Sequence, residues 1–145
     1  MSIETWKEEF YPETAQKAAK VSELYAIEHS LRKWSGFEKE ALNRHGLAYQ
    51  RFSLRDADGD GEDLFTADRD TCALCARHPS ADRGNRMFPM DCSACSLALS
   101  RGGVSCDECT SREADSPYRR SRNSPKRMLQ VLRRAKEFVE KADPK

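Results

Sequence analysis

The sequence predicts an α+β fold that is mainly helical, with a cysteine-rich irregular region between helices at the two ends of the chain. Three observations support this prediction: apolar residues recur at helical spacing near both ends, an acidic turn-rich segment follows the first helices, and all six cysteines lie in the middle. Hydrophobic residues make up 38% of the 145 residues. Because this apolar fraction gives a thin core, we expect one domain, 1–145, that needs a metal, a disulfide or a partner chain.

The segment 13–46 is predicted to form a helical hairpin. Residues 13–34 are expected to form one amphipathic helix, because apolar side chains recur there at steps of three and four. This stripe contains Ala15, Ala18, Val21, Leu24, Ile27, Leu31 and Trp34. Gly36 is expected to end the helix, since glycine tolerates left-handed backbone geometry. A second short helix is expected over 37–44 and should end at Gly46.

The next segment, 47–70, is predicted to be an acidic hairpin or loop. Residues 47–54 are expected to form a strand, 56–63 consist almost entirely of turn-forming residues, and 64–65 are expected to begin the returning strand. The turn also matches the first half of a calcium-binding loop. Ala67 occupies the position of the closing glutamate, however, so a solvated acidic turn is the favoured interpretation and calcium binding stays an open alternative.

All six cysteines fall within 71–110 as three Cys-x-x-Cys pairs. The pairs are Cys72-Ala-Leu-Cys75, Cys92-Ser-Ala-Cys95 and Cys106-Asp-Glu-Cys109. Two residues between thiols allow both sulfurs to reach one tetrahedral ion, at about 2.3 Å for zinc. Sixteen residues, 76–91, separate the first two pairs, which fits the insert of about 15–20 residues between two zinc knuckles. We therefore predict a zinc module similar to a zinc finger.

Several ligand sets fit this spacing. Zinc could use the first two pairs alone, Cys106 could replace one member of the middle pair, or His78 could join the set and permit a second ion. Thiols without metal and a redox-active Cys-x-x-Cys pair are weaker alternatives. The redox motif normally accompanies a βαβ unit, which the sequence does not indicate.

The last part of the chain is predicted to be a basic loop, 111–123, followed by a C-terminal helix, 124–142. Ser124 can cap this helix and Pro125 suits its first position. One apolar stripe runs along it and contains Met128, Val131, Leu132, Ala135, Phe138 and Val139.

Basic residues around the start of this helix could contact the phosphates of nucleic acid. They are Arg119, Arg120, Arg122, Lys126 and Arg127. The isoelectric point of about 7.6 is below the value of about 9 that is typical of dedicated nucleic-acid-binding domains. Nucleic-acid binding is therefore the alternative function.

No catalytic motif is present, so we predict a binding protein and not an enzyme. The three histidines are scattered, and neither a His-Glu-x-x-His motif nor a nucleophile elbow occurs. We expect neither a secretory signal nor a membrane span, because the start lacks a basic and then apolar stretch and no apolar run is long enough. The expected location is a reducing cytosol, where thiols stay reduced or bind metal.

Five segments together resemble a group of small, uncharacterised phage-encoded proteins, over most of the chain after about residue 26. The segments are His-Ser-Leu-Arg-Lys-Trp (29–34), Cys-Ala-Leu-Cys (72–75), Cys-Ser-Ala-Cys-Ser-Leu (92–97), Gly-Gly-Val-Ser-Cys (102–106) and Ser-Pro-Tyr (116–118). The resemblance implies a bacterial host cytosol and a protein that binds a host protein, such as an inhibitor of host defence, with zinc as a structural ion.

The resemblance also indicates which cysteines are metal ligands. The related proteins commonly have Pro after the middle pair, where this chain has Ser96, and Cys109 is peculiar to this chain. The implied metal ligands are therefore the first five cysteines, Cys72, Cys75, Cys92, Cys95 and Cys106.

Overall fold

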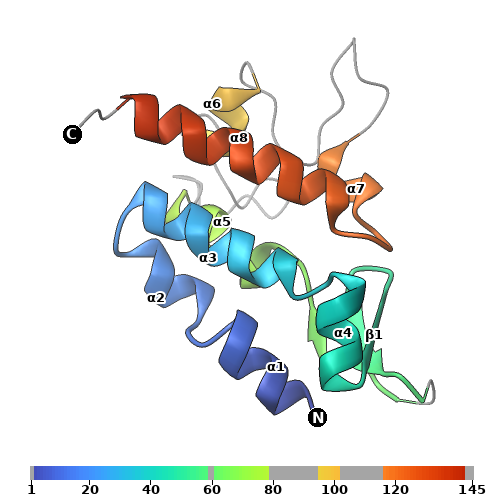
Figure 1. The fold of residues 1–145 in the computed structure, drawn as a ribbon. Coiled ribbons are helices and arrows are strands. Elements are labelled where there is room, and N and C mark those ends of the chain that lie inside the picture. Colours follow the sequence, from blue (N-terminus) through green and yellow to red (C-terminus); the bar gives the residue numbers. More distant parts are fainter. Residues whose placement is uncertain (1, 59–60, 79–94, 102–115, 143–145) are drawn as a thin grey trace, which may run out of the picture.

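The computed structural model of the chain describes residues 2–58, 61–78, 95–101 and 116–142. The helices are α1 (Ile3–Phe10), α2 (Ala15–Ala19), α3 (Glu23–Ser35), α4 (Lys39–His45), α5 (Ala73–Arg77), α6 (Ser96–Ser100), α7 (Pro117–Arg120) and α8 (Lys126–Ala142). The strands are β1 (Leu47–Gln50), β2 (Ser53–Asp56) and β3 (Phe65–Thr66), and a 3-10 turn spans Arg69–Thr71. This confirms a mainly helical α+β fold. Helix α3 lies between α8 on one side and α1 and α2 on the other (Figure 1).

Helix α1 is not among the predicted elements. The Ser2 hydroxyl accepts a hydrogen bond from the Thr5 amide at 3.2 Å, and the Thr5 hydroxyl accepts one from the Ser2 amide at 3.0 Å. This reciprocal pair satisfies two amides that a helix start leaves without partners. Threonine takes the place of the usual Glu or Gln, so the sequence signal was weak. Trp6 and Phe10 then point into the core.

The prediction of one helix over 13–34 is wrong, because the chain breaks there into α2 and α3. The Ser22 hydroxyl accepts a hydrogen bond from the Tyr25 amide at 3.0 Å and so begins a new helix. Val21 lies in the break and is 60% exposed, so it is not part of the buried stripe. Segment 13–46 is therefore three helices and not a hairpin of two, although α4 ends at a left-handed Gly46 as predicted.

Gly36 follows α3 as predicted, but for a different reason. Its φ of −69° is ordinary right-handed backbone. The Trp6 indole nitrogen donates to the Gly36 carbonyl at 2.8 Å, and a Cβ atom at Gly36 would lie 2.6 Å from the Trp6 ring. Close packing of the ring, and not backbone geometry, therefore requires glycine here.

The strands form an antiparallel sheet in the order β1-β2-β3. Residue Phe65 pairs with Leu54, which confirms the predicted returning strand. The single strand expected over 47–54 is wrong, because Arg51 and Phe52 form a tight turn with φ values of 52° and 66°. The Phe52 ring stacks on Tyr118 with centroids 4.4 Å apart. This contact helps to hold a left-handed turn that lacks the usual Asn or Gly.

The C-terminal helix is confirmed as α8, which packs against α3, α6 and α7. It begins at Lys126, so Ser124 and Pro125 precede it and do not occupy the predicted cap and first position. Its apolar stripe is buried from Met128 to Ala135, but Phe138 is 41% exposed. The basic loop predicted over 111–123 is wrong in part, because α7 lies within it. Ser116 caps this short helix and Pro117 occupies its first turn.

Aromatic rings form the centre of the core between α1, α4 and the sheet. Phe37 stacks on Trp6 at 5.5 Å and on Tyr49 at 4.4 Å between ring centroids. Phe65 lies 5.0 Å from Trp6. Trp34 is 4% exposed, in agreement with its predicted place in the core.

Candidate metal centre

The first predicted cysteine pair forms a tight turn at the start of α5. Cys72 precedes the helix, and the Cys75 amide donates to the Cys72 sulfur at 3.4 Å. Hydrogen bonding from Cys75 lowers the pKa of the Cys72 thiol to about 6, and nearby Lys33 adds to this effect although burial opposes it. Because the thiolate is the form that binds metal, the pair is suited to hold an ion near neutral pH.

Lys33 itself is buried, with 1% of its surface exposed. It extends from α3, and its ammonium group donates to the Thr71 carbonyl at 2.8 Å, next to Cys72. A buried ammonium group in this position stabilises negative charge on the sulfur. The sequence contained no signal for this role beyond the place of Lys33 in the 29–34 segment.

Cys95 immediately precedes α6. Burial raises the pKa of its thiol to about 12, and the charges of Cys72 and Glu23 act in the same direction, while the amides of Leu97 and Ala98 oppose them. Cys95 therefore keeps its proton when no cation is near. A divalent ion would reverse this preference, because a coordinating thiol is deprotonated.

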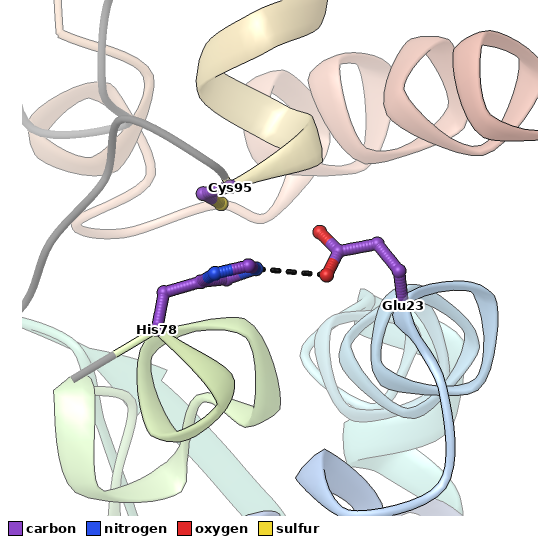
Figure 2. Close-up of side chains that lie close together, drawn as sticks. All are labelled: Glu23, His78 and Cys95. Atoms are coloured by element: carbon purple, nitrogen blue, oxygen red, sulfur yellow. Dashed lines mark hydrogen bonds and ion pairs between the residues drawn. The ribbon is translucent and has the colours of Figure 1, made fainter. Parts of the chain in front are cut away.

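Glu23, His78 and Cys95 form a group that could hold a metal ion. Their ligand atoms all lie within 4.8 Å of one another. Figure 2 shows that they come from three separate segments: Glu23 from the start of α3, His78 from the end of α5, and Cys95 from the start of α6. Each side chain is partly buried. Oxygen, nitrogen and sulfur donors that converge in this way suit a divalent transition metal.

Hydrogen bonds hold the Glu23 carboxylate firmly in this group. Its Oε1 atom accepts from Arg77 Nε at 3.0 Å and lies 2.8 Å from His78 Nε2. Its Oε2 atom accepts from the Ser96 amide at 2.8 Å. Burial works to raise the pKa of Glu23, but hydrogen bonds from Ser96 and His78 outweigh it and leave the pKa below its usual value. Glu23 is therefore ionised at neutral pH.

The structure brings some of the predicted ligands together and leaves others apart. His78, which the spacing left as an optional ligand, lies beside Cys95, and Glu23 joins them although no motif pointed to it. Within the described segments, Cys72 and Cys75 pair with each other and are not members of the Glu23 group. The remaining cysteines, Cys92, Cys106 and Cys109, lie outside the described residues, so their roles stay predictions.

The predicted phosphate-contacting residues lie on α7, the α7–α8 connection and the first turn of α8. All except the half-buried Arg127 are exposed. The Phe52 amide donates to the Arg122 carbonyl at 2.9 Å, and the Arg51 amide donates to Asn123 Oδ1 at 3.1 Å. These bonds bring exposed Arg51 close to the α7–α8 connection.

The acidic turn at 56–63 includes two residues outside the described part of the chain, so calcium binding there stays untested.

Among the helices in the described ranges, none is both long enough and apolar enough to cross a membrane. Comparisons with protein-family models, with curated proteins and with solved structures find no match to this chain.

Proposed function

We propose that this chain is a zinc-binding protein in which the metal is structural, and that it acts by binding a host protein and not by catalysis. One observation carries the metal assignment: Glu23, His78 and Cys95 meet within 4.8 Å although they are far apart in the sequence. The Cys72–Cys75 turn starts the same short helix that His78 ends.

Donor chemistry supports zinc over other ions. Thiolate and imidazole ligands suit zinc, whereas calcium and magnesium prefer oxygen ligands. Closed sites rich in cysteine are typical of structural zinc. Cys92 and Cys106 remain the predicted additional thiolates, and a metal bound here would join α5 and α6 to α3.

Metal content and thermal melting test this proposal. Purified reduced protein should contain stoichiometric zinc, and Co²⁺ exchanged into the site should give the intense near-ultraviolet absorption of thiolate coordination. Cys95→Ser should weaken this absorption, because one thiolate is lost, whereas the matched control Cys109→Ser should keep it in full. Protein that contains no stoichiometric metal and melts at the same temperature in strong chelator would contradict the proposal.

Exposed apolar side chains support protein binding. Among the described residues, the large hydrophobic side chains with the highest exposure are Val21, Tyr25, Leu99 and Phe138. Leu99 is 45% exposed on α6 and Phe138 is 41% exposed on α8, and these two helices pack against each other. Contiguous apolar patches on a surface often mark protein contacts, whereas single exposed side chains are common, so the proposal requires that Leu99 and Phe138 act together.

Crosslinking in a bacterial lysate, followed by a binding assay with the purified partner, tests this part. The Leu99→Asp/Phe138→Asp variant should lose saturable binding, and Glu140→Gln, an exposed change on α8, should retain it. Equal binding by all three proteins would exclude these side chains from the interface.

Nucleic-acid binding is the second candidate, favoured by the hydrogen bonds that hold Arg51 beside the α7–α8 connection. Binding through phosphates weakens steeply with salt. If this candidate is correct, replacing Arg51 and Arg122 with Ala should reduce both the affinity for DNA or RNA and the salt dependence. Unchanged binding in the double variant would exclude it.

A further inference from the structure

We propose that a hollow between α4 and α8 binds a phosphate group of a nucleic-acid strand. Residues from the start of α4 and from the beginning of α8 line this hollow, which has a volume of about 400 Å³; the two segments lie near each other in Figure 1. A hollow of this size is within the range of ligand sites. The inference rests on the second candidate function, nucleic-acid binding, and gives it a site that shares no residue with the metal group.

The charge of the hollow is the first argument. Three cationic side chains line it, Lys39 beside α4 and Lys126 and Arg133 on α8, and all three are exposed. No ion pair between residues that the structure describes includes any of them, whereas Arg44 and Arg77 pair with carboxylates at 2.9 and 3.0 Å. The three cations are therefore available to an anion from outside, and cationic side chains form their strongest hydrogen bonds with carboxylates and phosphates.

The floor of the hollow is the second argument. Pro125 and Leu129 line it and are buried. An apolar wall beside charges of one sign concentrates their field and raises the local concentration of anions. Among the described residues that line the hollow, Glu38 alone is acidic, so the cations outnumber it by three to one and the hollow attracts anions.

Further cations next to the hollow favour a strand over an isolated phosphate. Arg122 is two residues before Ser124, which lines the hollow, and the Arg51 amide donates to Asn123 Oδ1 at 3.1 Å between them. Both arginines are exposed. A basic surface that follows the backbone of a strand contacts its successive phosphates, so one strand can contact the hollow and then these arginines, whereas a free phosphate reaches only one of the two places.

Fluorescence anisotropy with a labelled DNA oligonucleotide, in single-stranded and in duplex form, tests this site. Lys39→Ala/Arg133→Ala should bind the preferred form about 10-fold more weakly, because hydrogen bonds to a charged group are lost. The affinity of this variant should also depend less steeply on salt. Arg134→Ala is the matched control, because Arg134 is the next residue of α8 and is exposed but does not line the hollow; its affinity should stay close to that of the wild type.

Glu38→Gln tests the sign of the charge that the hollow attracts. Glu38 precedes α4 and forms no side-chain capping bond there, so its replacement leaves the helix start intact. Loss of its negative charge should strengthen binding by about 2–5-fold, the size of an exposed ion pair. Misfolding does not produce a gain in affinity, so this result does not depend on the stability of the variant.

Three results would overturn the inference while nucleic-acid binding itself stands. They are equal weakening by Arg134→Ala and by the double variant, unchanged affinity in both the double variant and Glu38→Gln, and competition by thymidine monophosphate that is as strong as competition by the unlabelled oligonucleotide. The last result would assign the hollow to a free nucleotide. If the wild type binds neither form of the oligonucleotide, the second candidate function is overturned, and this inference with it.

Discussion

Around Trp6, aromatic rings from α1, the segment before α4 and the sheet pack directly against one another. At the other end of the core, α5 packs on α2 and α3 and α6 packs on α8, and the Glu23 carboxylate of α3 accepts hydrogen bonds from both segments. Trp6 is completely buried and contacts Phe37 and Phe65. At the other end, Leu74 and Leu97 are buried, but both helices have only five residues. Helices of this length are not stable alone.

The comparison shows two ways of holding a chain together. Buried apolar area stabilises the aromatic end without any ligand. The α5–α6 end buries less apolar surface in two short helices, and hydrogen bonds to Glu23 and, by our proposal, a metal add to that packing. Removal of metal should therefore destabilise the α5–α6 end more than the aromatic end. Substitutions in the aromatic core should lower the stability of both ends.

Metal removal should have the largest effect. Structural zinc contributes roughly 10–16 kcal/mol of apparent binding free energy in small zinc-dependent peptides. We expect a strong chelator to abolish hydrogen-exchange protection in α5 and α6 while amides of α1 and β1 stay protected. Hydrogen exchange measured by mass spectrometry checks this. If chelation reduced hydrogen-exchange protection equally at both ends, or at neither, the two ends would not differ in their dependence on metal.

Trp6→Ala should destabilise the aromatic end by about 3–5 kcal/mol, because it leaves a large cavity and removes the hydrogen bond to Gly36. Urea unfolding followed by circular dichroism measures this change. Phe138→Ala is the control; since that ring is 41% exposed, its unfolding midpoint should shift far less. Similar shifts in the two variants would mean that Trp6 is not central to the core.

Gly36→Ala should cost about 1–3 kcal/mol, the range for overpacking a filled site. The new Cβ would lie 2.6 Å from Trp6 and 2.7 Å from Phe10. Gly61→Ala tests the same substitution where the nearest atom, on Asp56, is 3.7 Å away. Thermal melting should be lower only for the Gly36 variant, and an unchanged melting temperature there would show that the ring can move aside.

The pH dependence linked to His29 should be the smallest effect. Burial lowers the pKa of this ring, while a bond to the Glu13 carbonyl opposes it and Lys33 acts with burial. The unfolded chain, with a histidine pKa of about 6.5, therefore binds the proton more tightly than the folded chain. The stabilising contribution of neutral His29 is present above this pH and decreases as the pH falls below it.

Urea unfolding at pH 7 and pH 5 measures this contribution. Between the two, the stability of wild type should fall more than that of His29→Gln, whose amide can still donate to the Glu13 carbonyl. An equal fall in both proteins would assign the acid sensitivity to other groups.

Local patterns in the sequence correctly predicted several elements. The apolar stripe identified α8, and Gly46 marked the end of α4. These predictions succeeded because helical periodicity and left-handed glycines reflect short-range geometry. The same periodicity joined α2 and α3 into one helix, because a cap at Ser22 breaks the backbone without breaking the apolar spacing.

Cysteine spacing alone indicated a metal site and named Cys95 and, as an option, His78. Glu23 could not be found in this way, since it lies 55 residues from His78 and 73 residues from Ser96 along the chain. Residue types and their spacing therefore determined the helical class and the chemistry available for a metal. Only tertiary packing decided which carboxylate meets that chemistry, because contacts between distant segments depend on how α3, α5 and α6 pack and not on any local pattern.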